Sequence, residues 1–297
     1  MTLSRFTKPK LPLLVFTDLD GTLLDHDDYG FAPALPALER LRAAAVPLIP
    51  TTSKTLAEMG PLNRALGNSH PCIVENGSAI VVPEGYFQEL EEGESEIGYR
   101  VLRLAPAYGE VLEVLLRLRQ TRGYRFRGFA DMSDAEVAAD TGLALEQARL
   151  ARRRLCSEPL RWQDSQPALE RFARDLAAAG LHLTRGGRYH HVLAAVDKAD
   201  AMTRLQGLYR RQGWHGFLNL ALGDSPNDLA LLQAADLAVV IPRKDGGRLE
   251  LDTGKRMIHA PEPGPAGWNR VVLDLIQELE QQNSTAIGLD PSDPSNG

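Results

Sequence analysis

The sequence predicts an α/β protein built on a doubly wound, mostly parallel β-sheet, with a smaller α+β domain inserted into the chain. Short apolar segments at 13–16, 46–50 and 218–222 are typical of buried strands, and each runs directly into polar residues. Amphipathic segments that predict helices alternate with these strands, an order that favours parallel pairing. The 297 residues, 43% hydrophobic and 24% charged, have the composition of a globular protein with room for two domains.

Two carboxylates follow the first of these apolar segments. Asp18 and Asp20 lie one residue apart, immediately before Gly21. Because alternate side chains of a strand share a face, both carboxylates can converge just beyond its carboxyl end. Carboxylates that close repel each other unless a cation lies between them or one keeps its proton, and both arrangements suit nucleophilic or acid–base chemistry on an anionic substrate. Asp and Gly are also common turn residues, so the pair alone leaves a polar turn open.

A second polar segment, Thr51 to Lys54, follows the strand at 46–50. Its hydroxyls are suited to capping the helix that we expect at 54–66. Beside Asp18 in a parallel sheet, one hydroxyl and nearby backbone N–H groups are also able to hold a phosphate oxygen at a helix N-terminus. Thr52 is the candidate for that role.

Two later segments carry further candidate residues. Lys198 starts a predicted helix, whose electropositive N-terminus disfavours a cation, and a cation near Asp18 would neutralise a phosphoryl group during its transfer. Asp224 follows the strand at 218–222 as Asp18 follows its own strand. Asp18, Asp20 and Asp224 around one cation would form a hard, oxygen-lined site that suits Mg²⁺. The segment after 218–222 is also suited to capping a helix.

The remaining patterns divide the chain into a core and an insertion. Helices are expected at 33–45, 106–121, 133–141, 145–153, 166–179, 197–212, 229–235 and 265–282. Further strands are expected at 72–74, 79–82, 99–104, 124–129, around 160, and at 181–185, 192–196, 237–241 and 257–260. The acidic segment 89–96 predicts a solvated loop. The core would comprise 1–84 and 189–282, the insertion 85–188 with helices on one face of its sheet, and a disordered tail 283–297.

Composition and charge exclude several classes of partner. The net charge of -6 gives no general attraction to nucleic acid, and no apolar run is long enough to span a bilayer. The first ten residues lack the apolar centre of a signal peptide. We therefore expect a cytoplasmic protein without nucleic-acid or membrane partners. Cys72 and Cys156 lie far apart and predict buried thiols rather than a disulfide or a metal framework. The sequence leaves the oligomeric state open.

The predicted insertion is rich in arginine, and most of these side chains are expected to be solvated or in local ion pairs. Better candidates for ligand binding lie in the segment 184–191, where glycines let the backbone approach a ligand and an arginine, Arg185 or Arg188, can bind a carboxylate or phosphate through two hydrogen bonds. His190 and His191 are adjacent and would face opposite sides of a strand, which argues against a shared metal ion.

Four segments, in chain order, resemble the motifs of a known family. They are Asp18 to Thr22, Thr52 with Ser53, Lys198, and Gly223 to Asp228. Together they resemble the haloacid dehalogenase (HAD) superfamily of phosphohydrolases, with a large cap domain inserted between the second and third motifs. A narrower resemblance is to mannosyl-3-phosphoglycerate phosphatases. The segments that carry it are 52–55, 75–77, 128–133, 136–138, 141–143, 158–159 and 187–190.

The resemblance implies a role for each matching residue. Asp18 would attack phosphorus to form an aspartyl-phosphate, and Asp20 would protonate the leaving oxygen and then activate water. The implied phosphate-binding residues are Thr52, Ser53, Lys198 and Asn227. The implied Mg²⁺ ligands are Asp18, the backbone carbonyl of Asp20, and Asp224, with Asp228 supporting them from behind. Positioning and charge neutralisation of this kind are the main demands of phosphoryl transfer.

The implied substrate is a small phosphorylated glycosylglycerate, namely mannosyl-3-phosphoglycerate or its glucosyl analogue, and the implied product is a compatible solute. By charge and hydrogen-bonding type, the candidate partners for its carboxylate and hydroxyls are Lys54, Asn76, Arg188 and His190. A sugar phosphatase of broader specificity is the alternative function. A third is a metabolite-binding protein that has kept the fold without catalysis.

Overall fold

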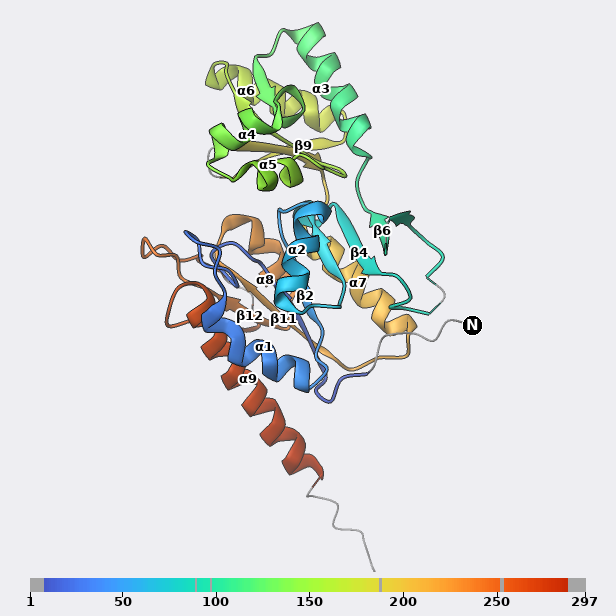
Figure 1. Cartoon of the computed structure of the whole chain (residues 1–297), viewed down its shortest axis with the longest axis vertical. Helices are drawn as coiled ribbons and strands as arrows, with labels where there is room; N and C mark the ends of the chain where they lie inside the picture. Colours follow the sequence, from blue (N-terminus) through green and yellow to red (C-terminus); the bar gives the residue numbers. More distant parts are fainter. Residues whose placement is uncertain (1–7, 89, 97, 187–188, 252–253, 288–297) are drawn as a thin grey trace, which may run out of the picture. The chain divides into compact units, whose positions relative to one another are not determined.

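The computed structural model describes residues 8–88, 90–96, 98–186, 189–251 and 254–287. Figure 1 traces the helices and strands along the chain. The chain divides into two compact units. Within the described part, the first unit comprises residues 8–48 and 216–287, and the second unit comprises residues 49–215. The division expected from the sequence, with an insertion at 85–188, uses other boundaries and stays a prediction.

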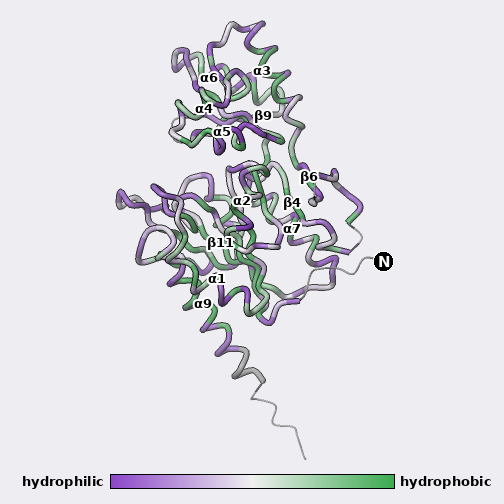
Figure 2. The backbone as a smooth tube through the Cα atoms, viewed as in Figure 1, coloured by the Kyte–Doolittle hydropathy of each residue, from purple (hydrophilic) through white to green (hydrophobic). Residues whose placement is uncertain are grey.

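The first unit is built around a five-stranded sheet with the order β13-β12-β11-β1-β2. Its strands are β1 (Leu13–Thr17), β2 (Leu48–Pro50), within which the two units divide, β11 (Leu218–Gly223), β12 (Leu237–Val240) and β13 (Arg256–His259). Strands β1, β11, β12 and β13 run parallel. Every residue of β1 and β12 is buried, as in strands covered on both faces, and Figure 2 shows a hydrophobic trace around β11. The predicted parallel α/β sheet is confirmed.

Helices of the first unit follow the predicted order. They are α1 (Leu35–Ala43) after the short 3-10 helix η1 (Ala32–Ala34), α8 (Leu229–Ala234) after η4 (Pro226–Asp228), and α9 (Gly264–Ile287). Helix α9 extends past Gln282, so the tail expected to be disordered from residue 283 begins as helix. The cause lies in the sequence, where the first helix-breaking residue of that tail is Gly288. The rest of the tail lies outside the described residues. No helix of the described ranges combines the length and apolarity that crossing a membrane requires.

One antiparallel sheet of the second unit has the order β3-β4-β6-β5. Its strands are β3 (Cys72–Val74), β4 (Ala79–Pro83), β5 (Glu94–Glu96) and β6 (Tyr99–Arg103), and the same unit contains α2 (Leu56–Leu66), η2 (Glu75–Gly77) and α7 (Lys198–Arg211). The strands expected at 72–74 and 79–82 are present as β3 and β4, which pair antiparallel. The prediction of a loop throughout 89–96 is wrong for Glu94–Glu96, which pairs with β6. All three side chains of this strand are exposed. Its acidic residues therefore indicated solvent exposure correctly, but they gave no sign that the segment forms an edge strand.

The other sheet of the second unit has the order β7-β8-β10-β9 and is antiparallel throughout. Its strands are β7 (Phe126–Gly128), β8 (Glu158–Trp162), β9 (Leu181–Gly186) and β10 (Tyr189–Ala194). The helices are α3 (Tyr108–Arg122), α4 (Asp134–Thr141) after η3 (Phe129–Asp131), α5 (Leu145–Ala151) and α6 (Gln166–Ala178). We call this sheet with its helices the cap.

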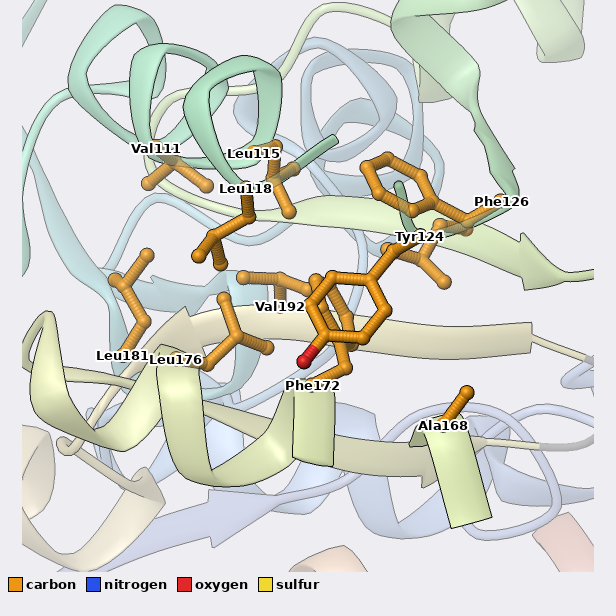
Figure 3. Packing of buried hydrophobic residues seen from close by; sticks show 11 residues of the cluster. Val111, Leu115, Leu118, Tyr124, Phe126, Ala168, Phe172, Leu176, Leu181 and Val192 are labelled. Atoms are coloured by element: carbon orange, nitrogen blue, oxygen red, sulfur yellow. The ribbon is translucent and has the colours of Figure 1, made fainter. Parts of the chain in front are cut away.

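Helices lie on both faces of the cap sheet, which corrects the expectation of helices on one face only. Side chains of α3 and α6 point toward one another in Figure 3 and form a buried cluster with Leu160 and Val192. Tyr189 belongs instead to a second cluster, with residues of α4 and α5. Residues 189 and 192 of one strand point to opposite faces because side chains alternate. The amphipathic pattern of α4 and α5 indicated an apolar partner but not which face of the sheet supplied it.

Phe172 is the central aromatic side chain of the α3–α6 cluster. It is fully buried, with its ring centroid 5.2 Å from that of Tyr124 and 5.1 Å from that of Trp162. We expect Phe172→Ala to lower the free energy of unfolding by about 3–5 kcal/mol, because it removes buried apolar contacts and leaves a cavity. Urea denaturation measures this change. Leu116→Ala, at an exposed position of α3, is the control and should change stability by less than ~0.5 kcal/mol.

A buried hydrogen-bond chain joins three rings of the second unit. His70 Nδ1 lies 2.7 Å from the Tyr86 hydroxyl, which lies 3.1 Å from the Tyr209 hydroxyl. Burial lowers the pKa of His70 from 6.5 to about 4. The folded protein therefore binds this proton less well than the unfolded chain between pH 6.5 and 4.

This difference predicts a pH-dependent stability. As the pH falls from 6.5 to 4, the contribution of neutral His70 should be lost, by roughly 3 kcal/mol in total. In His70→Gln the free energy of unfolding should fall less steeply over this range. Chemical denaturation at several pH values measures both slopes, with His215→Gln, at an exposed position, as the control. Equal slopes for His70→Gln and the wild type would contradict the assignment.

Candidate active site

Three buried carboxylates of the first unit lie close together. One oxygen each of Asp18, Asp224 and Asp228 lies within 4.8 Å of the other two. The exposed fractions of these residues are 5%, 6% and 0%. Asp20, which was expected beside Asp18, lies in the following turn and forms a bridge with Leu24.

Parallel strand pairing brings Asp18 and Asp224 to the same edge of the sheet. The Asp18 N–H donates to the Leu222 carbonyl over 2.9 Å and so extends the β1–β11 ladder by one residue. Gly21 follows with a φ of +83°, and a Cβ at this position would lie 2.9 Å from Asp224 Oδ2. Only glycine therefore combines this backbone conformation with the close approach to Asp224.

Hydrogen bonds fix the loop that carries Asp224. The Thr22 hydroxyl donates to Asp224 Oδ1 over 3.2 Å. Asp228 Oδ2 accepts the backbone N–H groups of Asp224 and Ser225, each over 3.1 Å. Gly223 has no room for a side chain, because a Cβ would overlap Asp228. Asp228 thus orients the Asp224 loop as well as contributing an oxygen to the cluster.

The donor set of this cluster fits a divalent cation. Three carboxylates at this separation repel one another strongly where water is excluded, and a cation among them removes that cost. All three offer hard oxygen ligands, the type that Mg²⁺ and Ca²⁺ prefer. A buried group of carboxylates that can hold a divalent metal is therefore present at the end of β1.

A cavity of about 520 Å³ opens beside Asp224 within the first unit. Gly21, Arg243 and Lys244 contribute to its lining. Lys244 Nζ lies 2.8 Å from Asp25 Oδ1 and 2.6 Å from Asp27 Oδ2, and its hydrogen bond is the main cause of the lowered pKa of Asp25. Asp224 is the member of the carboxylate cluster that contributes to the lining of this cavity.

The second unit holds the predicted phosphate-binding segment. Thr52 is buried, its N–H donates to the Ile73 carbonyl over 2.9 Å, and its hydroxyl accepts the Lys54 N–H over 3.1 Å. The cap of α2 is Thr55, which forms a capping box with Glu58. The alternative in which Thr52 caps this helix is therefore wrong, since the cap lies three residues later. Ser53 lies in the same turn.

Lys198 is 1% exposed at the first position of α7. Asp197 caps this helix by accepting the N–H groups of Ala199 and Asp200, over 2.8 and 3.0 Å. Burial of an ammonium group at an electropositive helix end is costly without an anion. A buried ammonium group at this position therefore needs an anionic partner.

The other residues predicted to bind the phosphate or the rest of the substrate lie in several parts of the chain. The Asn76 N–H donates to the Thr52 carbonyl over 2.9 Å. His190 pairs with Leu160 across the cap sheet, on the face covered by α3 and α6, and burial lowers its pKa. The Asn227 amide oxygen accepts a hydrogen bond from the Ser225 hydroxyl. Arg188 lies outside the described residues.

Sequence reasoning missed the support behind Asp18. The Trp268 indole N–H donates to the Thr17 hydroxyl over 3.0 Å, and both residues are fully buried. Thr22, noted only as part of the first motif, orients Asp224. Neither contact leaves a local signal, since the partners lie 251 and 202 residues apart in the sequence.

Comparison with known proteins places the chain in a family. A family model described as haloacid dehalogenase-like hydrolase matches residues 15–92. A glucosyl-3-phosphoglycerate/mannosyl-3-phosphoglycerate phosphatase of Methanococcoides burtonii is 39% identical over 264 residues, covering 89% of this chain and 97% of the relative. The chain belongs to the haloacid dehalogenase-like hydrolases. A phosphatase of the same description from Persephonella marina is 33% identical over 272 residues, covering 91% of this chain and 99% of the relative.

One solved structure of a related protein has the same fold as this chain. It is a HAD superfamily phosphatase of Bacteroides thetaiotaomicron, with a TM-score of 0.61 at 14% identity, covering 93% of this chain and 99% of the other. At this identity the likeness is one of fold. The sequence-based assignment to the HAD phosphatases, made from motifs at Asp18, Thr52, Lys198 and Asp224, is confirmed.

Removal of one carboxylate from the cluster of this HAD phosphatase tests metal binding. We expect Mg²⁺ to raise the melting temperature of the wild type, since binding to the folded state adds about 2.7 kcal/mol at a hundredfold excess over Kd. Asp224→Asn should lose this rise, and its metal-free form should melt no lower, because one repelling charge has been removed. Thermal melts with Mg²⁺ and with chelator measure both. Asp245→Asn, in the cavity lining outside the cluster, should keep the full rise.

Proposed function

We propose that this protein is a Mg²⁺-dependent phosphatase that hydrolyses glucosyl- or mannosyl-3-phosphoglycerate to the glycosylglycerate and inorganic phosphate. The observation that carries the proposal is the 39% identity to a phosphatase of that description over 97% of its length. The buried group of Asp18, Asp224 and Asp228 supports the proposal, because such a group can hold the divalent metal that the reaction would use.

Asp18 is the proposed nucleophile. A carboxylate oxygen of Asp18 attacks the phosphorus atom, and the bond between phosphorus and the glycerate oxygen breaks. Asp20 gives its proton to the departing oxygen, which therefore leaves as an uncharged hydroxyl group of the glycosylglycerate. The phosphoryl group remains on Asp18 as an aspartyl-phosphate.

Water completes the reaction. Asp20, now a carboxylate, takes a proton from a water molecule whose oxygen attacks the same phosphorus atom. The bond between phosphorus and the Asp18 oxygen breaks, which releases phosphate and returns both aspartates to their starting states. In the second step Asp20 thus acts as a base, because it lost its proton in the first step.

Cationic and polar groups would hold the phosphoryl oxygens during both steps. We assign this role to Thr52, Ser53, Lys198 and Asn227. Mg²⁺ would be held by the carboxylates of Asp18 and Asp224 and the backbone carbonyl of Asp20, and would neutralise charge that develops on the phosphoryl group. Asp228 would keep the Asp224 loop in position through its bonds to the loop N–H groups.

The rest of the substrate carries one carboxylate and several hydroxyls. Lys54, Asn76, Arg188 and His190 are the proposed partners by charge and hydrogen-bonding type. Lys54 and Asn76 have the stronger support, because both belong to the hydrogen-bonded loop around Thr52.

Asp18→Asn should abolish turnover while the protein stays folded. The amide is not a nucleophile, so we expect a fall in kcat of about 10³-fold or more. Phosphate release from glucosyl- and mannosyl-3-phosphoglycerate measures this, and circular dichroism checks the fold. Asp245→Asn should retain activity. An Asp18→Asn enzyme with wild-type turnover would exclude the mechanism.

The same assay with a panel of sugar phosphates tests the substrate. We expect kcat/KM for the glycosyl-3-phosphoglycerates to exceed that for simple hexose phosphates by at least about 100-fold, because the latter lack the carboxylate and leave its partners unpaired. Comparable values across the panel would instead support the sugar phosphatase of broader specificity. No phosphate release from any of them with Mg²⁺ present would support a non-catalytic binding protein.

A further inference from the structure

Glu75 is a fully buried glutamate at the end of β3. Its carboxylate accepts three hydrogen bonds from one short segment of the cap. These come from the Leu155 N–H at 2.6 Å, the Cys156 N–H at 3.0 Å and the Ser157 hydroxyl at 2.7 Å. Arg154 Nε lies 3.7 Å from the same carboxylate and is itself almost completely buried.

The backbone around Glu75 holds the predicted phosphate-binding segment. The Glu75 N–H donates to the Lys54 carbonyl over 3.0 Å, and the Asn76 N–H donates to the Thr52 carbonyl over 2.9 Å. One residue therefore binds the cap segment through its side chain and the turn of Thr52 and Lys54 through its main chain.

The same turn also contacts the start of α7. Gly77 packs so closely against this helix end that a Cβ would overlap the Asp197 carbonyl, one residue before Lys198. A second bond joins the cap to this region, from the Thr55 hydroxyl to the Leu150 carbonyl over 3.0 Å. Three segments that are distant from one another in sequence, 52–54, 154–157 and the start of α7, thus meet at residues 75–77.

The geometry of this turn is costly by itself. Glu75, Asn76 and Gly77 have consecutive φ values of +50°, +58° and +100°. For a non-glycine residue such a conformation costs on the order of 1–3 kcal/mol, and it persists only where the surroundings enforce it. Three donors and an arginine around a buried carboxylate supply such enforcement. A tight hairpin alone would not need a buried acid.

We propose that Glu75 is a positioning residue that couples the cap segment Leu155–Ser157 to the phosphate-binding residues Thr52 and Lys198. The proposal rests on the proposed function, which assigns those two residues to the phosphoryl group. Glu75 does not touch the substrate and acts through the turns that it holds. Its loss should displace phosphate ligands, and a displacement of about 1 Å near reacting groups is enough to lower a rate about 100-fold.

Glu75→Gln is the main test, because it keeps the shape and replaces one acceptor oxygen by a donor facing N–H groups. We expect kcat for p-nitrophenyl phosphate to fall about 10- to 100-fold, and the inhibition constant for inorganic phosphate to rise at least about fivefold. Ser157→Ala removes one donor to Glu75 and the acceptor for Arg154 Nη2, and it should change both quantities in the same direction, by a smaller factor. The double variant should be no worse than Glu75→Gln, since both changes break one linkage.

Glu158→Gln is the matched control. Glu158 is an equally buried glutamate, and it accepts hydrogen bonds only inside the cap, from the Tyr108 hydroxyl and the Ala130 N–H, among the bonds that the described residues show. Its substitution should lower the melting temperature but leave kcat and the phosphate inhibition constant within about twofold of the wild type. If lower stability alone caused the loss of activity in Glu75→Gln, Glu158→Gln would lose activity too.

The outcomes separate this proposal from the proposed function. Wild-type kcat and phosphate inhibition in Glu75→Gln, or additive effects in the double variant, would overturn the positioning role. If Glu75→Gln does not fold, unchanged values in Ser157→Ala overturn it instead. A wild type that hydrolyses p-nitrophenyl phosphate but neither glycosyl-3-phosphoglycerate would overturn the substrate assignment and leave the test of Glu75 intact.

Discussion

Mutual repulsion among three buried carboxylates is the constraint on which the first unit depends. Asp18, Asp224 and Asp228 lie within a few ångströms of one another, so the surrounding chain has to hold them against that force. Parallel pairing of β1 with β11 fixes two of them to one edge, and the absence of side chains at Gly21 and Gly223 lets the loops close around them. The Trp268–Thr17 bond anchors the strand behind Asp18.

Much of this architecture could be predicted from the sequence, because it depends on local patterns. Apolar segments followed by Asp18 and by Asp224 indicated buried strands ending at one edge, and that geometry alone brings the two carboxylates together. The order of helices and strands could also be predicted, because it too depends on local patterns of apolar and polar residues. The family resemblance then supplied roles that no spacing contains, such as the separate tasks of Asp18 and Asp20.

What could not be predicted depends on contacts between distant segments. The sequence 75–77 is a strong tight-turn signal, and nothing local reveals that Glu75 turns inward to residues 155–157. The acidic composition of 89–96 indicated solvent exposure correctly but concealed the edge strand at Glu94–Glu96, whose partner is β6. Likewise, an amphipathic pattern shows that a helix has an apolar face but not which surface covers it, which is why helices were expected on only one face of the cap sheet.

Buried acids in this protein are stabilised in two opposite ways, and the difference indicates their use. At Glu75 one carboxylate faces three donors and an arginine from the chain itself, so its charge is satisfied internally and its effect is to join segments. At the end of β1, Asp228 also accepts loop N–H groups, but oxygens of three carboxylates lie together there, an arrangement that favours an external cation. The hydrogen bonds around Glu75 join segments best if they never open. The carboxylates at the end of β1, by contrast, have to remain able to exchange ligands. A phosphatase needs both, because exchange of substrate and product at the carboxylates is productive only if the phosphate ligands keep their positions from one turnover to the next.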